Sequence, residues 1–239
     1  MLALLARYLL GILLVSWRYM WTTTPLRREE GPGDGTDLPP PIPEELADSP
    51  LQSAASGVGP LFHRRFWVHV ADSRRSPAEV IASVVDGFHR FVPREVVGVR
   101  REAIGRLELG EEFEVQMPGP WNGPVRVIQA DESCLRLATL PGHLEAGQIR
   151  FRAGRQGDLL VFEIEAWARP ATKVVQLLYV RLRLAKEVQL NMWVRFCQSV
   201  VRASDGRLVD GVHISTRAVP EHAIPLVAGE PDRIAGTVR

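Results

Sequence analysis

The residues best suited to chemistry are a histidine and a carboxylate in a segment rich in turn-forming residues. Residues 140–147 read LPGHLEAG, which puts His143 two positions before Glu145. A carboxylate this close can orient an imidazole for general base catalysis. The structural alternative is that the proline and glycines predict a turn, whose backbone amides the two polar side chains would bond. Both interpretations stay open at this point.

A second pair of carboxylates, Glu163 and Glu165, lies two positions apart in an alternating segment. Paired carboxylates serve as acid and base in glycoside hydrolysis. Charged residues at outward positions of the neighbouring segments favour cross-strand ion pairs instead. We therefore predict an exposed ladder of charges on the outer face of a sheet and assign no catalytic residue. The other members of this ladder are Glu112, Glu114, Arg126, Arg136, Arg150 and Arg152.

A tryptophan stands in a loop of prolines and glycines. Residues 117–124 read MPGPWNGP, with Trp121 before an Asn-Gly pair. Asn-Gly is typical of a tight hairpin turn, so a purely structural loop is one interpretation. A large amphipathic ring at a loop tip also suits the gate of a cavity or a contact with a partner. The sequence does not choose between them.

Metal and cofactor motifs are not found in the sequence. It contains neither a His-x-x-x-His nor a Cys-x-x-Cys spacing, and zinc needs several such ligands. No glycine-rich loop precedes a helix as in phosphate-binding motifs, and no serine lies in a Gly-x-Ser-x-Gly elbow. Cys134 and Cys197 fall among apolar residues and are typical of buried free cysteines in a reducing compartment. We expect no metal and no cofactor.

The hydrophobic periodicity predicts the helices and strands that carry these residues. Residues 148–152 and 160–169 alternate between apolar and polar, which predicts a hairpin with one buried face. After Pro170 the apolar residues recur at helical spacing and predict one long helix over residues 172–203. Upstream, Ser76 and Glu79 form a capping box for a helix that we expect to end at Gly87. Further strands are predicted at residues 61–70, 96–102, 111–117, 124–130 and 134–140.

This order of elements predicts an α+β helix-grip fold. A curved antiparallel sheet of about seven strands would surround the long C-terminal helix, with an apolar helix added at the N-terminus. A curved sheet and one long helix leave space for an apolar pocket between them. We expect its walls to be Phe151, Phe162, Ile164, Ala166 and Met192, and its mouth to carry Trp121, His143 and Glu145.

Three segments resemble a known family. They are TLPGHLEAGQIRF at residues 139–151, EIEAWARP at 163–170 and KEVQLNMWVRFC at 186–197. They are similar to the domain of unknown function DUF1990, whose members carry a like Thr-Leu-Pro-Gly-His-x-Glu-x-Gly run before a strand and a long helix. The resemblance covers roughly residues 57–203 and includes His143 and Glu145. It implies a fold like that of the helix-grip, Bet v 1-like binders of lipids and small molecules, and it implies no activity.

The overall composition excludes some partners. The chain has 239 residues, of which 46% are hydrophobic, enough for one substantial domain with appendages. Its net charge is +1 and the two signs are interspersed. Nucleic-acid binding normally appears as a stripe of lysine and arginine, so we expect no nucleic-acid partner.

The first residues form the most apolar segment. Residues 1–21 read MLALLARYLLGILLVSWRYMW, a length that can span a membrane if Arg7 and Arg18 reach opposite interfaces. We expect a membrane-associated helix, spanning or lying in the surface; an apolar helix docked on the domain and a signal peptide are the alternatives. Arg27 and Arg28 follow this segment and would keep the domain on the cytoplasmic side.

The remaining boundaries come from polarity. Residues 22–56 are rich in proline, glycine and acidic residues and predict a disordered linker that spans about 30 Å. Residues 57–203 would be the helix-grip domain. Residues 204–239 are polar and are expected to be a tail, with a weak strand candidate at 208–216.

Three functions fit these features. The first is a non-catalytic, membrane-associated binding module for an apolar or amphipathic small molecule or lipid. The second is a module that binds an unidentified protein partner and whose interior is filled by its own side chains. The third is a cyclase- or hydrolase-like enzyme that uses His143 and Glu145. We prefer the first, because no nucleophile, metal set or cofactor loop supports catalysis.

Overall fold

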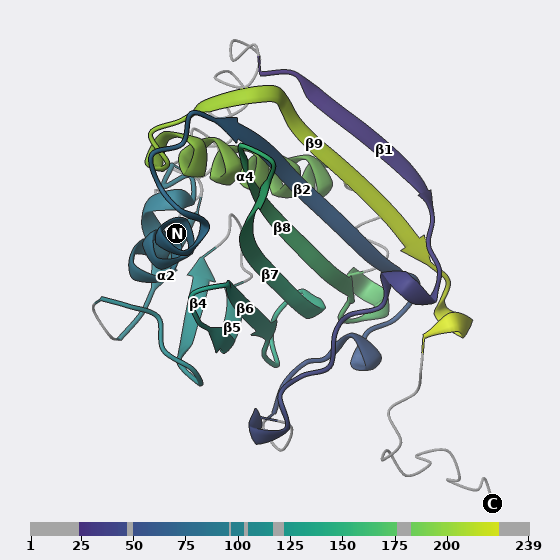
Figure 1. The fold of residues 1–239 in the computed structure, drawn as a ribbon. Coiled ribbons are helices and arrows are strands. Elements are labelled where there is room, and N and C mark those ends of the chain that lie inside the picture. The colour runs from purple at the N-terminus through teal and green to yellow at the C-terminus, as the bar shows by residue number, and fades with distance from the viewer. Residues whose placement is uncertain are drawn as a thin grey trace, which may run out of the picture.

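The computed structural model describes residues 24–46, 50–95, 97–102, 105–116, 122–175 and 183–224. A nine-stranded sheet curves around two helices, α2 and α4 (Figure 1). The strand order is β1-β9-β2-β8-β7-β6-β5-β4-β3, and every neighbouring pair is antiparallel except β1 and β9. The predicted helix-grip fold is confirmed.

The bounds of the elements are as follows. The strands are β1 (Leu26–Pro32), β2 (Leu61–Ala71), β3 (Gly98–Arg100), β4 (Glu112–Gln116), β5 (Asn122–Ala130), β6 (Cys134–Thr139), β7 (Glu145–Gln156), β8 (Leu159–Pro170) and β9 (Arg207–Val219). The α-helices are α2 (Pro77–Phe91) and α4 (Arg183–Ala203), and short 3-10 helices lie at Gly35–Asp37, Glu44–Leu46, Ala54–Ser56 and Glu221–Ala223.

Helix α2 begins as its sequence predicts but ends later. The Ser76 hydroxyl accepts from the Glu79 amide and the Glu79 carboxylate accepts from the Ser76 amide, a complete capping box. At Gly87 the backbone leaves helical geometry, with φ −143°, yet the helix resumes. The expectation that it ends at Gly87 was wrong, because Phe88 and Phe91 are buried in the core and hold the last turn in place.

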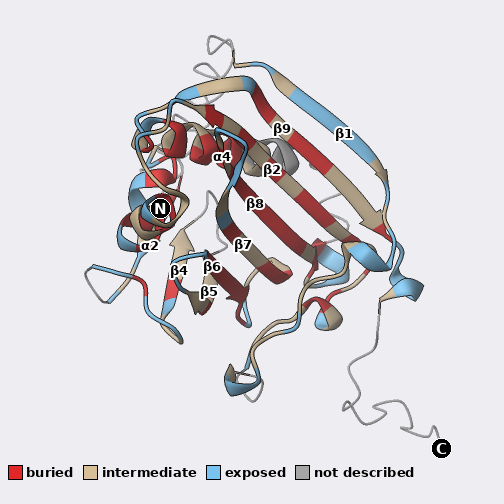
Figure 2. Cartoon of the chain, viewed as in Figure 1, coloured by how far each residue is buried: buried red, intermediate tan, exposed pale blue. Residues whose placement is uncertain are grey.

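Aromatic side chains fill the interior between the sheet and the two helices. Phe196 of α4 is fully buried and its ring lies 5.1 Å from that of Phe151 and 5.4 Å from that of Phe91, measured between centroids. Phe162 stacks on the same ring from β8. Figure 2 shows that buried residues run along β8, β2 and β9. The half of the concave face that lies under α2 and the end of α4 is therefore solid.

The structure adds strands where the sequence predicted none, or only a weak one. β9 pairs with β2 along the whole of its length, so part of the segment expected to be a tail is a central strand. β1 pairs in parallel with β9 and forms the sheet edge, within the segment expected to be a disordered linker. The linker prediction was wrong there because an edge strand is held by backbone hydrogen bonds and needs few apolar residues; β1 is largely exposed.

The rest of the predicted linker also lies on the domain. We call residues 33–58, apart from 47–49, the outer strap, because it crosses the convex face of the sheet. The Arg136 guanidinium donates to the Pro41 carbonyl at 2.9 Å, and the Gln148 amide donates to the Pro40 carbonyl at 2.7 Å. The backbone of Gln52 bonds Thr139 and Gly147. Pro40 and Pro41 lie outside the helices and strands, and side chains of the sheet satisfy their carbonyls.

Two sequence-based expectations fall outside the described residues. They concern the apolar helix at residues 1–21 and the loop that carries Trp121. In the portions of the chain that the structure covers, no helix combines the length and apolarity needed to cross a membrane.

Candidate functional site

The candidate site lies on the concave face, at the end of the sheet where β7 begins. Strand register puts Arg64 between Ala166 and Thr216, and the next row puts Phe62 between Ala168 and Ala218. These side chains point to the same side as the core residue Phe66, because alternate residues of a strand share a face. Most of them are small, and Phe62, Ala168, Thr216 and Ala218 are only partly buried. This end of the face is therefore less filled than the aromatic interior.

Arg64 is the central group of the site. Only 8% of the residue is exposed, which is unusual for an arginine. The residues two positions before and after it on the same face of β2 are the apolar Phe62 and Phe66. Its Nη1 donates to Gln189 Oε1 of α4 at 2.7 Å and lies 3.8 Å from Glu145 Oε1. The guanidinium stands 5.2 Å from the centroid of the Phe62 ring, a cation–π distance. Its Nε is buried without a hydrogen-bond partner among the described residues.

A small hollow adjoins this arginine. It has a volume of about 50 Å³ and lies between α4 and the β1–β9–β2 edge. It is lined by Arg28, Glu29, Glu30, Arg64, Phe66, Gln189, Leu190, Ile214 and Thr216. A cavity that binds benzene measures about 150 Å³, so this hollow fits a few waters or a small polar group but not a whole apolar molecule.

The predicted pair at the mouth is present but is not joined as a catalytic pair. His143 Nδ1 accepts from the backbone N–H of Glu145 at 2.9 Å, so the proton of the neutral ring sits on Nε2. Burial lowers the pKa of His143 and keeps the ring neutral near pH 7. The Glu145 carboxylate accepts from Gln189 at 3.0 Å instead. The bond from His143 to the backbone favours the structural interpretation, and Glu145 joins Arg64 at the concave site.

The predicted wall residues divide into two groups. Phe151, Phe162 and Ile164 are fully buried in the core, and Met192 is nearly so. Ala166 lies beside Arg64 at the less filled end. The structure therefore separates residues that we expected to line one pocket. Sequence reasoning missed Arg64, although a signal existed: it is a charge between Phe62 and Phe66 on a strand face that is otherwise apolar.

Comparisons with known proteins bear on the family. The sequence profile described as "Domain of unknown function (DUF1990)" matches residues 61–203, which is more than half of the chain. This chain belongs to the DUF1990 family. A search of curated proteins gives no match to it.

Solved structures similar to this DUF1990 protein have low identity to it. A major latex-like protein from Panax ginseng is 8% identical, with a TM-score of 0.42, covering 60% of this chain and 97% of its own. Norcoclaurine synthase from Thalictrum flavum is 15% identical, with a TM-score of 0.41, covering 63% and 91%. A hypothetical protein from Helicobacter pylori is 12% identical, with a TM-score of 0.43, covering 70% and 98%. At these identities the similarity concerns the fold alone.

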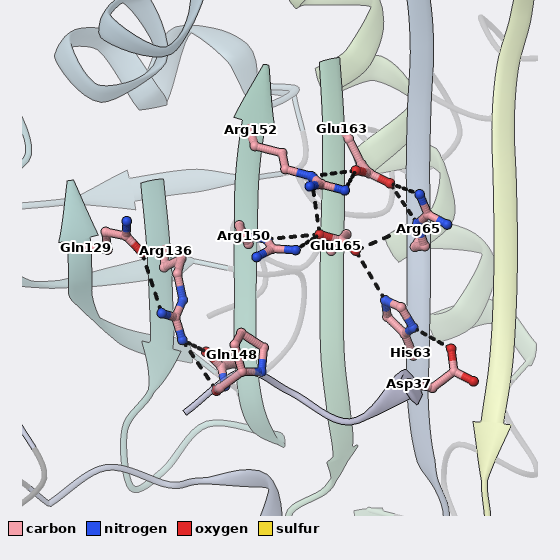
Figure 3. Close-up of polar contacts among 11 residues, drawn as sticks. Asp37, His63, Arg65, Gln129, Arg136, Gln148, Arg150, Arg152, Glu163 and Glu165 are labelled. Atoms are coloured by element: carbon pink, nitrogen blue, oxygen red, sulfur yellow. Dashed lines mark hydrogen bonds and ion pairs between the residues drawn. The ribbon is translucent and has the colours of Figure 1, made fainter. Parts of the chain in front are cut away.

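On the outer face of the DUF1990 domain, the two central carboxylates of the predicted charge ladder are not exposed, although Glu112 and Arg152 are about half exposed. Glu163 and Glu165 are each only 5% exposed, beneath the arginines that surround them (Figure 3). Glu163 accepts from Arg65 at 2.7 Å and from Arg152 at 2.6 Å, while Glu165 accepts from Arg150 at 2.9 Å. The prediction of a solvated ladder was wrong because arginines on both neighbouring strands fold over the carboxylates.

The protonation of Glu165 follows from these contacts. Burial opposes its ionisation, but the His63 ring, whose Nε2 lies 3.6 Å from the carboxylate, the hydrogen bond from Arg150 and the charges of Arg150 and Arg152 outweigh it and lower the pKa to about 2. Glu165 is thus a fixed anion near pH 7 and unsuited to act as a general acid. On its other side, His63 contacts Asp37 of the outer strap at 2.8 Å. This network ties the strap to the sheet.

The two cysteines of the DUF1990 protein are buried and free. Burial raises the pKa of Cys134 to about 11 and raises that of Cys197 further. Both thiols are therefore protonated and weakly nucleophilic at neutral pH. In the described parts of the chain, no group of three or more histidines, cysteines or carboxylates is placed to hold a metal ion.

Proposed function

We propose that this domain is a non-catalytic binding module for a small amphipathic molecule, held at the Arg64 end of the concave face. One observation carries the proposal: a partly open strip of small apolar side chains ends at a buried guanidinium beside a hollow. Ligand sites combine apolar walls with a few placed polar groups, and this strip has both.

The position of the ligand differs from our first expectation. The neighbouring aromatic rings lie 5.1–6.1 Å from the Phe196 ring, measured between centroids. Stacked and edge-on rings are in contact at these distances. A ligand in that interior would have to displace core side chains. The apolar part of a ligand fits better along Phe62, Ala168 and Ala218, which are partly accessible.

Binding of an environment-sensitive apolar dye tests this proposal. The dye should brighten with the full chain, and Ala166→Trp should abolish the signal, because the new ring would occupy the row of Arg64. Leu109→Trp is the matched control, since it adds the same ring at a side chain that is 58% exposed. Native mass spectrometry of the protein as purified would identify a ligand that stays bound. A signal unchanged by Ala166→Trp would contradict this location.

The filled core favours a second candidate, a protein-interaction module without a small-molecule site. If neither dye nor co-purified ligand is found with the folded chain, this second function replaces the first. As part of the first proposal we keep residues 1–21 as a membrane-associated segment on the cytoplasmic side. Their apolar run and flanking arginines support that location.

A further inference from the structure

Arg64 is incompletely satisfied by the chain itself. A guanidinium carries five N–H donors, and among the described residues Arg64 makes one side-chain hydrogen bond, to Gln189. Its Nε is buried and unpartnered among the described residues, and the nearest Glu145 oxygen lies 3.8 Å away from Nη1, beyond hydrogen-bond distance. A buried N–H without an acceptor is costly, and such a group in a native fold calls for an explanation.

The surroundings of this donor suit a small oxyanion. Arg64 lines the hollow together with Arg28 and the hydroxyl of Thr216. The carboxylates of Glu29 and Glu30 line it as well, so the two arginines and these two glutamates balance in charge. Gln189 already bonds Arg64 and Glu145, so the unpartnered Nε of Arg64 is the donor that selects an oxyanion. Arginine binds carboxylates through two parallel N–H donors, and such charged bonds are among the strongest in proteins. The volume of about 50 Å³ fits a head group better than a chain.

We infer that the ligand of this site is an amphipathic carboxylate whose head group is bound by Arg64 in the hollow. Its apolar tail lies along Phe62, Ala168 and Ala218. The inference rests on the proposed function and adds the chemistry of the head group. A cationic head has no acceptor for the buried Nε of Arg64, so a ligand with such a head is disfavoured.

Three ligands of equal tail length test the head group: decanoate, decanol and decyltrimethylammonium, each titrated into the full chain by calorimetry. Decanoate should bind about tenfold or more tightly than decanol, a ratio expected of a charged hydrogen bond. Arg64→Gln should reduce this preference to near unity. Arg207→Gln, at a largely exposed arginine, is the matched control and should leave the preference unchanged.

A second variant protects the test against misfolding of the first. Thr216→Val keeps the shape of the side chain and removes its hydroxyl, so decanoate should weaken severalfold while decanol stays the same. Acetate alone should compete only at far higher concentration than decanoate, since it lacks the tail. If acetate competes as well as decanoate, the site binds a free anion and the tail assignment is overturned.

The outcomes separate the two claims. Absence of binding by all three ten-carbon ligands contradicts the proposed function itself. Equal binding of decanoate and decanol, unaffected by Arg64→Gln and Thr216→Val, leaves the proposed function standing and overturns the carboxylate inference. Preference for decyltrimethylammonium overturns it as well.

Discussion

At the scale of single residues, burial decides what the charged side chains do. Glu163 and Glu165 alternate outward on β8 and would be called surface residues from sequence. In the folded chain their carboxylates are shared among arginines on β2 and β7, in a setting of low exposure. Removing one member of a buried ion pair leaves an uncompensated charge, which is far worse than losing an exposed pair. We expect these two carboxylates to stabilise the sheet.

We therefore expect Glu163→Gln with Glu165→Gln to lower the free energy of unfolding by about 3–5 kcal/mol at pH 7, measured by urea titration. Glu112→Gln, at a more exposed carboxylate of the same face, should cost at most about 1 kcal/mol. A double variant as stable as the parent chain would show that the arginines re-pair with solvent.

The same pair gives a dependence on pH. The pKa of Glu165 is lowered from 4.5 to about 2 in the fold, so its contribution is present above pH 4.5 and is lost as pH falls toward 2. The loss should be about 2 kcal/mol once solvent screening by the partly exposed arginines is allowed for. In the double variant this fall should be absent. If the stability of the parent chain and of the double variant falls equally with pH, the loss comes from other titrating groups.

At the scale of elements, the outer strap and β1 complete the sheet. The strap supplies carbonyl acceptors to Arg136 and Gln148 and buries Leu61 and Trp167 in a second small cluster with Ala54 and Val219. Strand β1 covers one edge of β9. The sheet therefore extends on both sides of the segment that matches the family profile, residues 61–203.

Truncation measures what these elements contribute. A chain that starts at Thr24 should unfold at the same urea concentration as the full chain, because it keeps β1 and the strap. A chain that starts at Ser56 should be less stable by several kcal/mol, since Arg136, Gln148 and Trp167 lose their cover. Equal stability of the two shortened chains would mean that the strap contributes nothing measurable.

At the scale of the whole molecule, hydrogen bonds hold the chain to the domain from Thr24, the first residue that the structure describes. Gln198 of α4 donates to the Thr24 hydroxyl at 2.9 Å, and Val212 donates to the Pro25 carbonyl at 2.9 Å. The long, flexible tether that we expected before residue 56 is therefore not there. A membrane-bound segment at residues 1–21 would hold the β1–β9 edge close to the bilayer.

Fractionation of cells tests this location. The full chain should sediment with membranes and the chain starting at Thr24 should stay in the supernatant, because residues 1–21 carry the apolar run. The shortened chain must keep the stability of the full one for the comparison to hold. If both chains remain in the supernatant, the proposal that residues 1–21 associate with a membrane is wrong.

Features that depend on neighbours along the chain could be predicted from the sequence. The capping box at Ser76, the alternation of 160–169 and the helical spacing before Phe196 each follow from contacts a few residues apart, and together they define the helix-grip order. The family motif around His143 was recognisable for the same reason. Boundaries moved by a few residues where packing decided them, as at Gly87.

The burial of polar residues and the partners they contact could not be predicted from the sequence and depend on the tertiary fold. Arg64, Glu145 and Gln189 are far apart in the chain and come together because β2, β7 and α4 converge at one end of the sheet. The outer strap has a composition typical of disordered segments. It is nevertheless held on the sheet, because Arg136 and Gln148 donate hydrogen bonds to its carbonyls. Contacts between residues so far apart in the sequence depend on how the whole sheet curves. No local sequence pattern predicts that curvature.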